Sequence, residues 1–252
     1  MSNCAYLTLV RHSKTEREFP MAQTRVLMVL TSHDTMGVSG KRTGNWFDEV
    51  ATPFYKFKEA GFDVTLASPS GGAAPIDPFS YDDPFMTDNT HKFLADEGAQ
   101  RMLANTLKFS EIDTNGYDGV FFPGGYGQLW DLASNSKVIR SIESWIERKT
   151  PVAMVCHAPA ILRDAKKRNG EQLVKGMNVT GFTDAEDDEL DLSRHLLFSL
   201  ERALVINGAN FTRSNRNWFP NVVQDGALLT GQNPASAAPL ADALIGRLRD
   251  LK

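Results

Sequence analysis

The most informative stretch of this 252-residue chain is PVAMVCHAPA, residues 151–160. Its first five residues are apolar and typical of a buried strand, and a helix-compatible stretch follows at once. This order places the thiol of Cys156 at a sharp turn between strand and helix, above the edge of a sheet. Free N–H groups at the start of a helix stabilise an anion, so we expect Cys156 to be a reactive thiolate, with His157 as its immediate neighbour.

The sequence on both sides of this stretch alternates between strand and helix patterns. Such alternation predicts right-handed βαβ units and a doubly wound, mainly parallel sheet with helices on both faces, a three-layer α/β fold. A Pro-, Gly- and Asp-rich loop at 68–89 is of the length that usually caps a site. We expect strands at 25–32, 62–67, 117–122, 151–155, 177–182 and 222–230, and helices from Phe47 to Gly61 and at 95–107, 138–148, 184–191 and 235–248.

Composition and charge exclude several classes of protein. The net charge of −4 argues against a dedicated nucleic-acid binder, and the chain contains no apolar run long enough to span a membrane. Two cysteines, Cys4 and Cys156, cannot build a disulfide framework, so we expect a reducing, cytoplasmic location. Histidines 33, 91 and 195 lack ligand spacing, and no metal site is expected.

We expect a single α/β domain over residues 21–252. Residues 1–20 read as an N-terminal extension that can be disordered, and they lack the pattern of a signal peptide. Met21 precedes the first convincing strand, so either Met1 or Met21 is the true start.

Several polar features follow predicted strands. They are Cys156 with His157, the turn GGYG at 124–127, and the segment 31–33, while Glu49 lies near the start of the first helix. Because ligands bind at the carboxyl ends of strands in open parallel sheets, we expect these residues to converge.

Five ordered blocks carry a family resemblance: GKRTGNWFDE (40–49), FPGGYGQLWD (122–131), VCHAPA (155–160), TGFTD (180–184) and TGQNPAS (230–236). With them the chain resembles the ThiJ/PfpI superfamily, within it the heat-shock chaperone-like branch that contains glutathione-independent glyoxalase III. The resemblance implies a flavodoxin-like fold of the class I glutamine amidotransferase type.

The resemblance also implies a set of catalytic residues. Cys156 matches the nucleophile of the family, His157 the histidine that follows it, and Glu49 the acidic residue close to the sulfur. The third member of the triad aligns best with Asp187, with Glu186 as the alternative. A buried carboxyl beside a thiolate has a raised pKa, so we expect Glu49 to hold a proton at neutral pH.

An oxyanion hole is implied at the glycine turn. The backbone N–H groups of Gly125 and His157 would form it, with Gly124 and Tyr126 beside the substrate. Tyr126 departs from the family, which often has histidine there, and Met154 stands where the family usually has a smaller residue.

The activity that the resemblance implies is the conversion of methylglyoxal and related α-oxoaldehydes into 2-hydroxy acids such as D-lactate, without glutathione or another cofactor. Two alternatives remain open. One is a protein or nucleotide deglycase that uses the same thiol, and the other is a non-enzymatic stress chaperone or redox sensor. A homodimer is the assembly that the resemblance implies.

Overall fold

The computed structural model describes residue 1 and residues 23–251. Apart from Met1, the predicted extension over 1–20 lies outside the described residues, as do Cys4 and the alternative start at Met21. The described residues form a seven-stranded sheet in the order β3-β2-β1-β4-β5-β9-β8.

The sheet is parallel except at one edge, where β8 runs antiparallel to β9. The predicted mainly parallel sheet is therefore confirmed. Its strands are β1 (Arg25–Val29), β2 (Asp63–Ser68), β3 (Leu107–Lys108), β4 (Gly119–Phe122), β5 (Val152–Val155), β8 (Val222–Asp225) and β9 (Leu228–Gly231).

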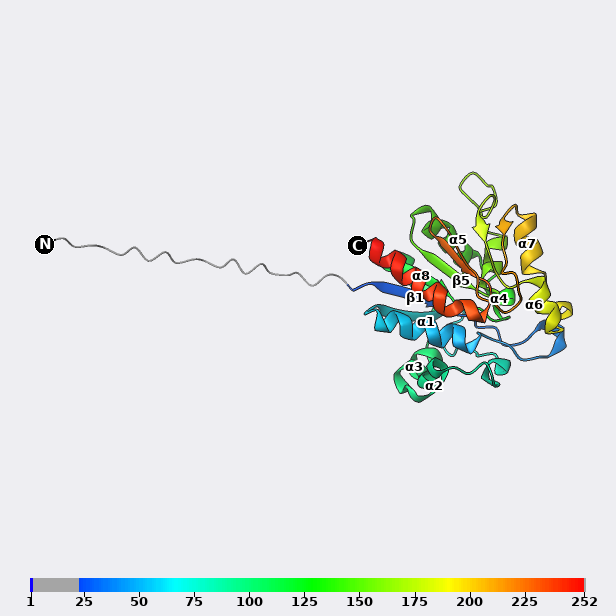
Figure 1. The fold of residues 1–252 in the computed structure, drawn as a ribbon, viewed down its shortest axis with the longest axis horizontal. Coiled ribbons are helices and arrows are strands. Elements are labelled where there is room, and N and C mark those ends of the chain that lie inside the picture. Colours follow the sequence, from blue (N-terminus) through cyan, green and yellow to red (C-terminus); the bar gives the residue numbers. More distant parts are fainter. Residues whose placement is uncertain (2–22, 252) are drawn as a thin grey trace.

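Helices cover both faces of the sheet (Figure 1). Side chains alternate along β1, so that Leu27 and Val29 join one hydrophobic cluster while Val26 and Met28 join the other. The first cluster includes α4 (Gln128–Asp131), α5 (Ser136–Glu147) and α7 (Leu200–Ile206). The second includes α1 (Phe47–Glu59), α2 (Asp88–Ala95), α3 (Glu97–Ala104) and α8 (Ala237–Asp250).

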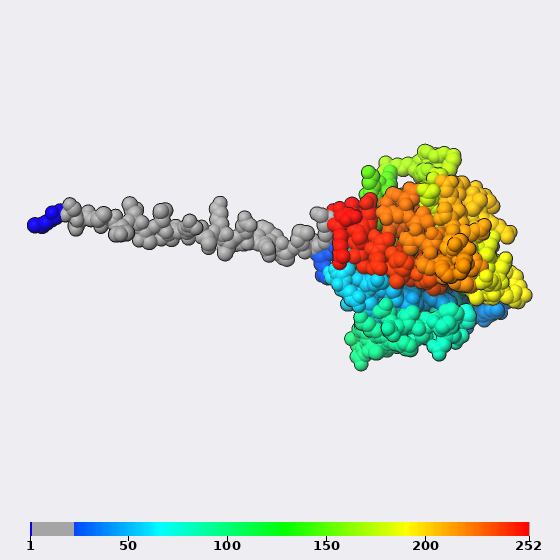
Figure 2. Space-filling model, viewed as in Figure 1, coloured from blue at the N-terminus to red at the C-terminus, as the bar shows by residue number. Residues whose placement is uncertain are grey.

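The first and last helices of the domain lie side by side. In the space-filling view, α8 (red) lies beside the segment that contains α1 (blue to cyan), with the α2–α3 segment (cyan to green) next to it (Figure 2). Contacts between α1 and α8 hold the first and last helices together.

Three predicted elements differ from the structure. The helix expected at 95–107 is the shorter α3, because Asp96 caps its start by accepting hydrogen bonds from the N–H groups of Gly98 and Ala99, and the separate helix α2 precedes it. The run 177–182 gives only the short β6 (Asn178–Val179), which pairs with β7 (Asn210–Phe211) outside the main sheet. The run 222–230 is two strands, β8 and β9.

The α8 layer supports the sheet, and a core truncation there tests this packing. Leu244 is fully buried in α8, so Leu244→Ala is expected to lower the free energy of unfolding by about 2–5 kcal/mol. The matched control is Leu251→Ala at the end of the same helix, where the side chain is 55% exposed and the loss should stay below about 1 kcal/mol. Urea unfolding of both variants measures the difference, and equal losses would contradict the described packing.

Candidate active site

Cys156 lies at the turn that follows β5, with a backbone φ of 60°. This left-handed conformation is rare for a residue with a side chain and needs support from the surroundings. The support comes from both sides of the residue. The N–H of Cys156 donates to the carbonyl of Gly231 at 3.0 Å, and its carbonyl accepts from the N–H of Phe182 at 2.9 Å.

A buried chain of polar groups leads away from the sulfur. The Sγ atom of Cys156 lies 3.4 Å from Nδ1 of His157, and Nε2 of the same ring lies 3.2 Å and 3.4 Å from the two carboxylate oxygens of Asp187. A carboxylate that accepts from Nε2–H leaves a lone pair on Nδ1, facing the sulfur. The structure therefore brings together three of the predicted site residues in the order thiol, base and carboxylate.

Tyr126 holds this chain in place. Its hydroxyl donates to Asp187 at 2.9 Å, and its ring lies 4.3 Å from the ring of His157. Phe182 lies against the imidazole as well, at 4.5 Å. Burial, and next the charge of Asp187, raise the pKa of Tyr126, so the phenol stays a donor. The residue that departs from the family thus fixes the position of the carboxylate.

Glu49 reaches the sulfur from α1 and is fully buried. Its Oε2 accepts a hydrogen bond of 2.7 Å from the N–H of Gly124, while its Oε1 has no hydrogen-bond partner among the described residues. Burial raises the pKa of Glu49 from its ordinary 4.5 to about 8. The predicted raised pKa is confirmed, and the carboxyl holds its proton at neutral pH.

The prediction that Cys156 rests as a thiolate is wrong. Burial, and next the charge of Glu49, raise the pKa of the thiol well above its usual value. The backbone N–H groups of Gly125 and His157 act in the opposite direction without reversing this shift. The segment after the turn is also a short 3₁₀ helix, η5 (Ala158–Arg163), and not an α-helix. A base must therefore remove the proton before the sulfur can attack, and His157 is in position to do so.

The glycine turn is shaped by the close approach of other atoms. A Cβ on Gly124 would lie 2.4 Å from the Cβ of Cys156 and 2.5 Å from Oε2 of Glu49. A Cβ on Gly125, where φ is 110°, would lie 2.2 Å from the carbonyl oxygen of Gly44. Only glycine fits at these two positions. The N–H groups of Gly125 and His157, predicted to form the oxyanion hole, both face the sulfur.

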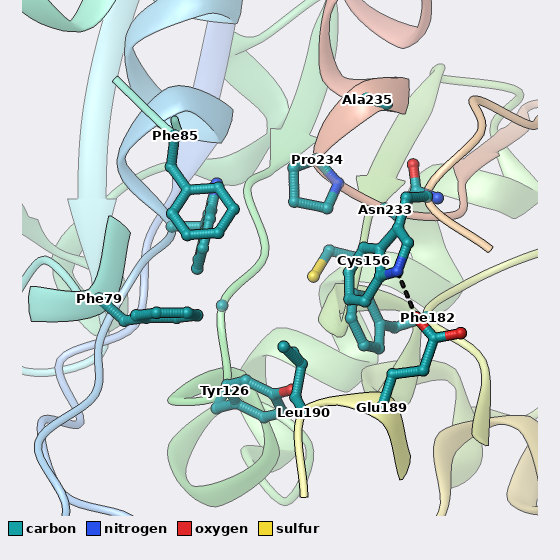
Figure 3. A pocket seen from close by; sticks show the side chains of 13 residues that line it. Phe79, Phe85, Tyr126, Cys156, Phe182, Glu189, Leu190, Asn233, Pro234 and Ala235 are labelled. Atoms are coloured by element: carbon teal, nitrogen blue, oxygen red, sulfur yellow. Dashed lines mark hydrogen bonds between the residues drawn. The ribbon is translucent and has the colours of Figure 1, made fainter. Parts of the chain in front are cut away.

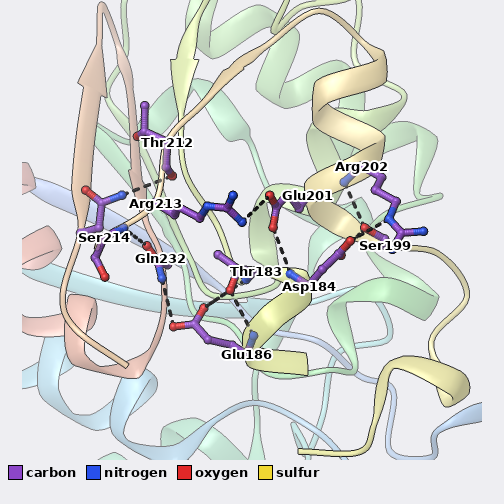
Figure 4. A network of polar contacts seen from close by, with 11 residues as sticks. Thr183, Asp184, Glu186, Ser199, Glu201, Arg202, Thr212, Arg213, Ser214 and Gln232 are labelled. Atoms are coloured by element: carbon purple, nitrogen blue, oxygen red, sulfur yellow. Dashed lines mark hydrogen bonds and ion pairs between the residues drawn. The ribbon is translucent and has the colours of Figure 1, made fainter. Parts of the chain in front are cut away.

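Glu186, the alternative to Asp187, points elsewhere. Its Oε1 accepts from the side chains of Gln232 and Asn233 and from the N–H of Trp218, and its Oε2 accepts from Thr183. Figure 4 shows part of this network, which lies at the start of α6 (Asp184–Glu189). Glu186 therefore ties three segments of the wall together, while its neighbour Asp187 meets His157.

The segment 31–33, expected to converge with the other features, does not line the sulfur site. The hydroxyl of Thr31 and the N–H of Ser32 both donate to Asp131, and the ring of His33 stacks on Trp130. These contacts join the end of β1 to α4 and give the segment a structural role.

A cavity of about 510 Å³ opens above Cys156 (Figure 3). Much of its wall is aromatic, a feature that the sequence patterns did not indicate. Phe79 and Phe85 come from the 68–89 loop, so this loop forms part of the cavity wall. The lining residues are Trp46, Phe79, Phe85, Gly125, Tyr126, Cys156, Phe182, Glu189, Leu190, Trp218, Asn233, Pro234 and Ala235.

No three His, Cys, Asp or Glu side chains in residues 23–251 group in a way that could hold a metal ion. Within the same part of the chain, every helix is too short or too polar to cross a membrane.

Comparison with known proteins places this chain in a family. The chain is 32% identical over 235 residues to glyoxalase 3 of Candida albicans, covering 88% of this chain and 97% of that protein. It is 32% identical over 239 residues to the glutathione-independent glyoxalase HSP31 of Saccharomyces cerevisiae, covering 91% and 100%. The crystal structure of glyoxalase III from Candida albicans superposes with a TM-score of 0.80 at 30% identity, covering 88% of this chain and 96% of the other.

The family profile extends over most of the described domain. It matches residues 47–247, a range that contains Glu49, the glycine turn, Cys156 and Asp187. The resemblance seen in the five sequence blocks is thereby confirmed, and the chain belongs to the DJ-1/PfpI family.

Proposed function

We propose that this protein is a glyoxalase III-like lyase, which converts methylglyoxal and related α-oxoaldehydes into 2-hydroxy acids without glutathione. The observation that carries the proposal is the buried chain from Cys156 through His157 to Asp187 at the floor of an apolar cavity. The two relatives described above, both named glyoxalases, support it. The catalytic roles of the residues are part of the proposal.

In the first step, Cys156 adds to the aldehyde. Nδ1 of His157, 3.4 Å from the sulfur, takes the thiol proton as the S–C bond forms. The aldehyde oxygen becomes an oxyanion, which the N–H groups of Gly125 and His157 stabilise before it takes the proton back from the imidazole. The product of this step is a neutral hemithioacetal, and His157 is again a free base.

In the second step, a proton moves between neighbouring carbons. His157 removes the proton from the former aldehyde carbon, and the protonated carboxyl of Glu49 gives its proton to the former ketone oxygen, which leaves a neutral enediol. The imidazole then delivers its proton to the former ketone carbon, while Glu49 recovers a proton from the hydroxyl on the former aldehyde carbon, which becomes the thioester carbonyl. One carbon is oxidised and its neighbour is reduced, so the step needs no external oxidant or reductant. It leaves a thioester of the 2-hydroxy acid on Cys156.

In the third step, water hydrolyses the thioester. His157 takes a proton from the attacking water, the new C–O bond forms, and the C–S bond breaks. The sulfur leaves as a thiolate and recovers a proton from the imidazole, and the 2-hydroxy acid is released. Asp187 keeps the ring in the tautomer that all three steps use, and Tyr126 keeps Asp187 in position.

The proposal includes a cytoplasmic, homodimeric enzyme with no cofactor. A reducing compartment suits a protein whose reaction depends on a free thiol. Deglycation of proteins or nucleotides would use the same thiol, whereas a chaperone role would not need it. Subcellular fractionation and gel filtration test location and assembly.

Lactate formation tests the central claim. Purified protein mixed with methylglyoxal, in the absence of glutathione, is expected to produce lactate, and Cys156→Ala should abolish it because no thioester can form. Enzymatic measurement of D-lactate follows the reaction. The claim is wrong if wild type makes no lactate, or if the alanine variant makes as much. A second assay uses the hemithioacetal of a cysteine peptide after free methylglyoxal has been removed. Loss of this adduct on addition of the enzyme would indicate deglycation, and no loss would indicate that the enzyme acts on free methylglyoxal.

The role of Asp187 is tested by removing its charge. In Asp187→Asn the imidazole loses the carboxylate charge, and the amide can present a donor in its place, so the tautomer is no longer fixed and we expect turnover to fall by roughly 10- to 100-fold. Asp188→Asn is the matched control, because Asp188 is the next residue in α6 and is exposed. In Asp187→Asn, the rate at which iodoacetamide alkylates Cys156 should fall together with turnover. Equal effects of the two variants, or unchanged alkylation, would remove Asp187 from the mechanism.

The protonation of Glu49 is tested through stability. Because its folded-state pKa of about 8 lies above its ordinary 4.5, its stabilising effect is complete below about pH 4.5 and is lost as the pH rises through 8. The loss is on the order of 5 kcal/mol. Glu49→Gln keeps an acceptor for Gly124 but has no carboxyl to ionise. The stability of wild type, measured by urea unfolding from pH 5 to pH 8, should therefore fall relative to this variant, and parallel curves would refute the raised pKa.

A further inference from the structure

We infer that the preferred substrates are α-oxoaldehydes with a bulky apolar side group, aryl or branched alkyl, and not methylglyoxal itself. The inference rests on the proposed function, because it assumes that the carbonyl carbons react at Cys156. It adds the chemical class of the rest of the substrate, which four features of the cavity determine.

The first feature is size. Methylglyoxal has five heavy atoms, which fill at most about 150 Å³ at the ~30 Å³ that a water molecule takes in the liquid. The cavity above Cys156 has a volume of about 510 Å³. Most of this space would stay unfilled around methylglyoxal, whereas cavities of this size are ordinary sites for much larger ligands.

The second feature is a wall of three aromatic rings. Trp46 and Phe85 pack edge to face with ring centroids 5.0 Å apart, and Phe79 lies 5.0 Å from Phe85 and 6.0 Å from Trp46. In Figure 3, Phe79 and Phe85 stand on the side of the cavity opposite Phe182, with the sulfur of Cys156 between them. This cluster presents ring faces and edges to the cavity, a surface that favours an apolar or aromatic ligand.

The third feature is the opposite wall, where Trp218 packs edge to face on Phe182 with centroids 5.7 Å apart. The indole N–H of Trp218 donates to Glu189, and its backbone N–H donates to the buried Glu186 at 2.9 Å. The ring is therefore held in place although 39% of the residue is exposed. Phe79, on the facing wall, is 43% exposed. An apolar side group between these two rings would remove both from water.

The fourth feature is charge. Among the described residues that line the cavity, none is lysine, arginine or histidine, and Glu189 carries the acidic side chain. The amide nitrogen of Asn233 is occupied by Glu186 and by the carbonyl of Phe219. A phosphate or carboxylate on the substrate would find no cation among these lining residues, and Lys41 and Arg42 belong to an adjoining cavity, so the wall above Cys156 favours a neutral, apolar side group.

Phenylglyoxal and methylglyoxal are the probes. Wild type is expected to show a kcat/KM for phenylglyoxal at least about 10-fold above that for methylglyoxal. Trp218→Ala should lower the ratio of the two values by roughly 10-fold, because it opens one wall. The control is Phe219→Ala, whose side chain is also half exposed but does not line the cavity, and this variant should keep the wild-type ratio.

A binding measurement separates this inference from the proposed function. Acetophenone has a methyl group in place of the aldehyde and cannot react, so calorimetry reports its affinity without turnover. It should bind wild type and Cys156→Ala alike, and Trp218→Ala about 10-fold more weakly, because the variant lacks one aromatic wall.

The outcomes then divide cleanly. The inference is overturned, while the lyase proposal stands, if methylglyoxal is turned over and the kcat/KM for phenylglyoxal is no higher than that for methylglyoxal. It is also overturned if Trp218→Ala leaves the ratio of these two values unchanged. If neither aldehyde yields a 2-hydroxy acid, the lyase proposal is wrong, and the binding of acetophenone then tests the apolar cavity by itself. Binding that depends on Trp218 supports an apolar-ligand cavity, and binding that does not depend on Trp218 overturns it.

Discussion

The site depends on one constraint, the burial of two acidic groups side by side. The Cys156 sulfur and the Glu49 carboxyl lie together below the cavity, and Gly124 is glycine because any Cβ there would collide with both side chains. Burial raises both pKa values, and the charge of Glu49 raises that of Cys156 further, so both groups keep their protons at neutral pH. A buried pair without net charge escapes the high cost of isolated ions in a low-dielectric site. Chemistry must then begin from a neutral thiol, which makes the adjacent base essential.

The sheet makes this arrangement possible. β5 is an inner strand, paired with β4 on one side and β9 on the other, so its carboxyl end is fixed by two ladders. The left-handed turn at Cys156 follows directly, and hydrogen bonds to Gly231 and from Phe182 hold it. Each partner of the sulfur comes from a different element: Glu49 from α1, the glycine turn from the end of β4, and Asp187 from α6. The site is therefore a property of the whole fold and not of one motif.

This distribution explains what the sequence could predict. Apolar runs located the inner strands, and the spacing of the family blocks brought Glu49, Cys156, His157 and Asp187 into one hypothesis, which the geometry groups as expected. The resting state of the thiol was not predictable, because burial is a tertiary effect and local sequence shows only the nearby helix start. The aromatic wall was missed for the same reason. Its rings come from positions as distant as Trp46 and Trp218, and each reads alone as a core residue.

Tyr126 shows how a change at one position can preserve the geometry of a site. A phenol has one proton, and here it goes to Asp187, so the same carboxylate accepts from both Tyr126 and Nε2 of His157. A histidine at this position could adopt either of two neutral tautomers, and its protonation would depend on pH. Burial and the Asp187 charge raise the pKa of Tyr126, so the phenol stays protonated and always donates. The orientation of the imidazole is thus fixed by a donor that does not titrate near neutral pH, and the lone pair on Nδ1 stays directed at the sulfur.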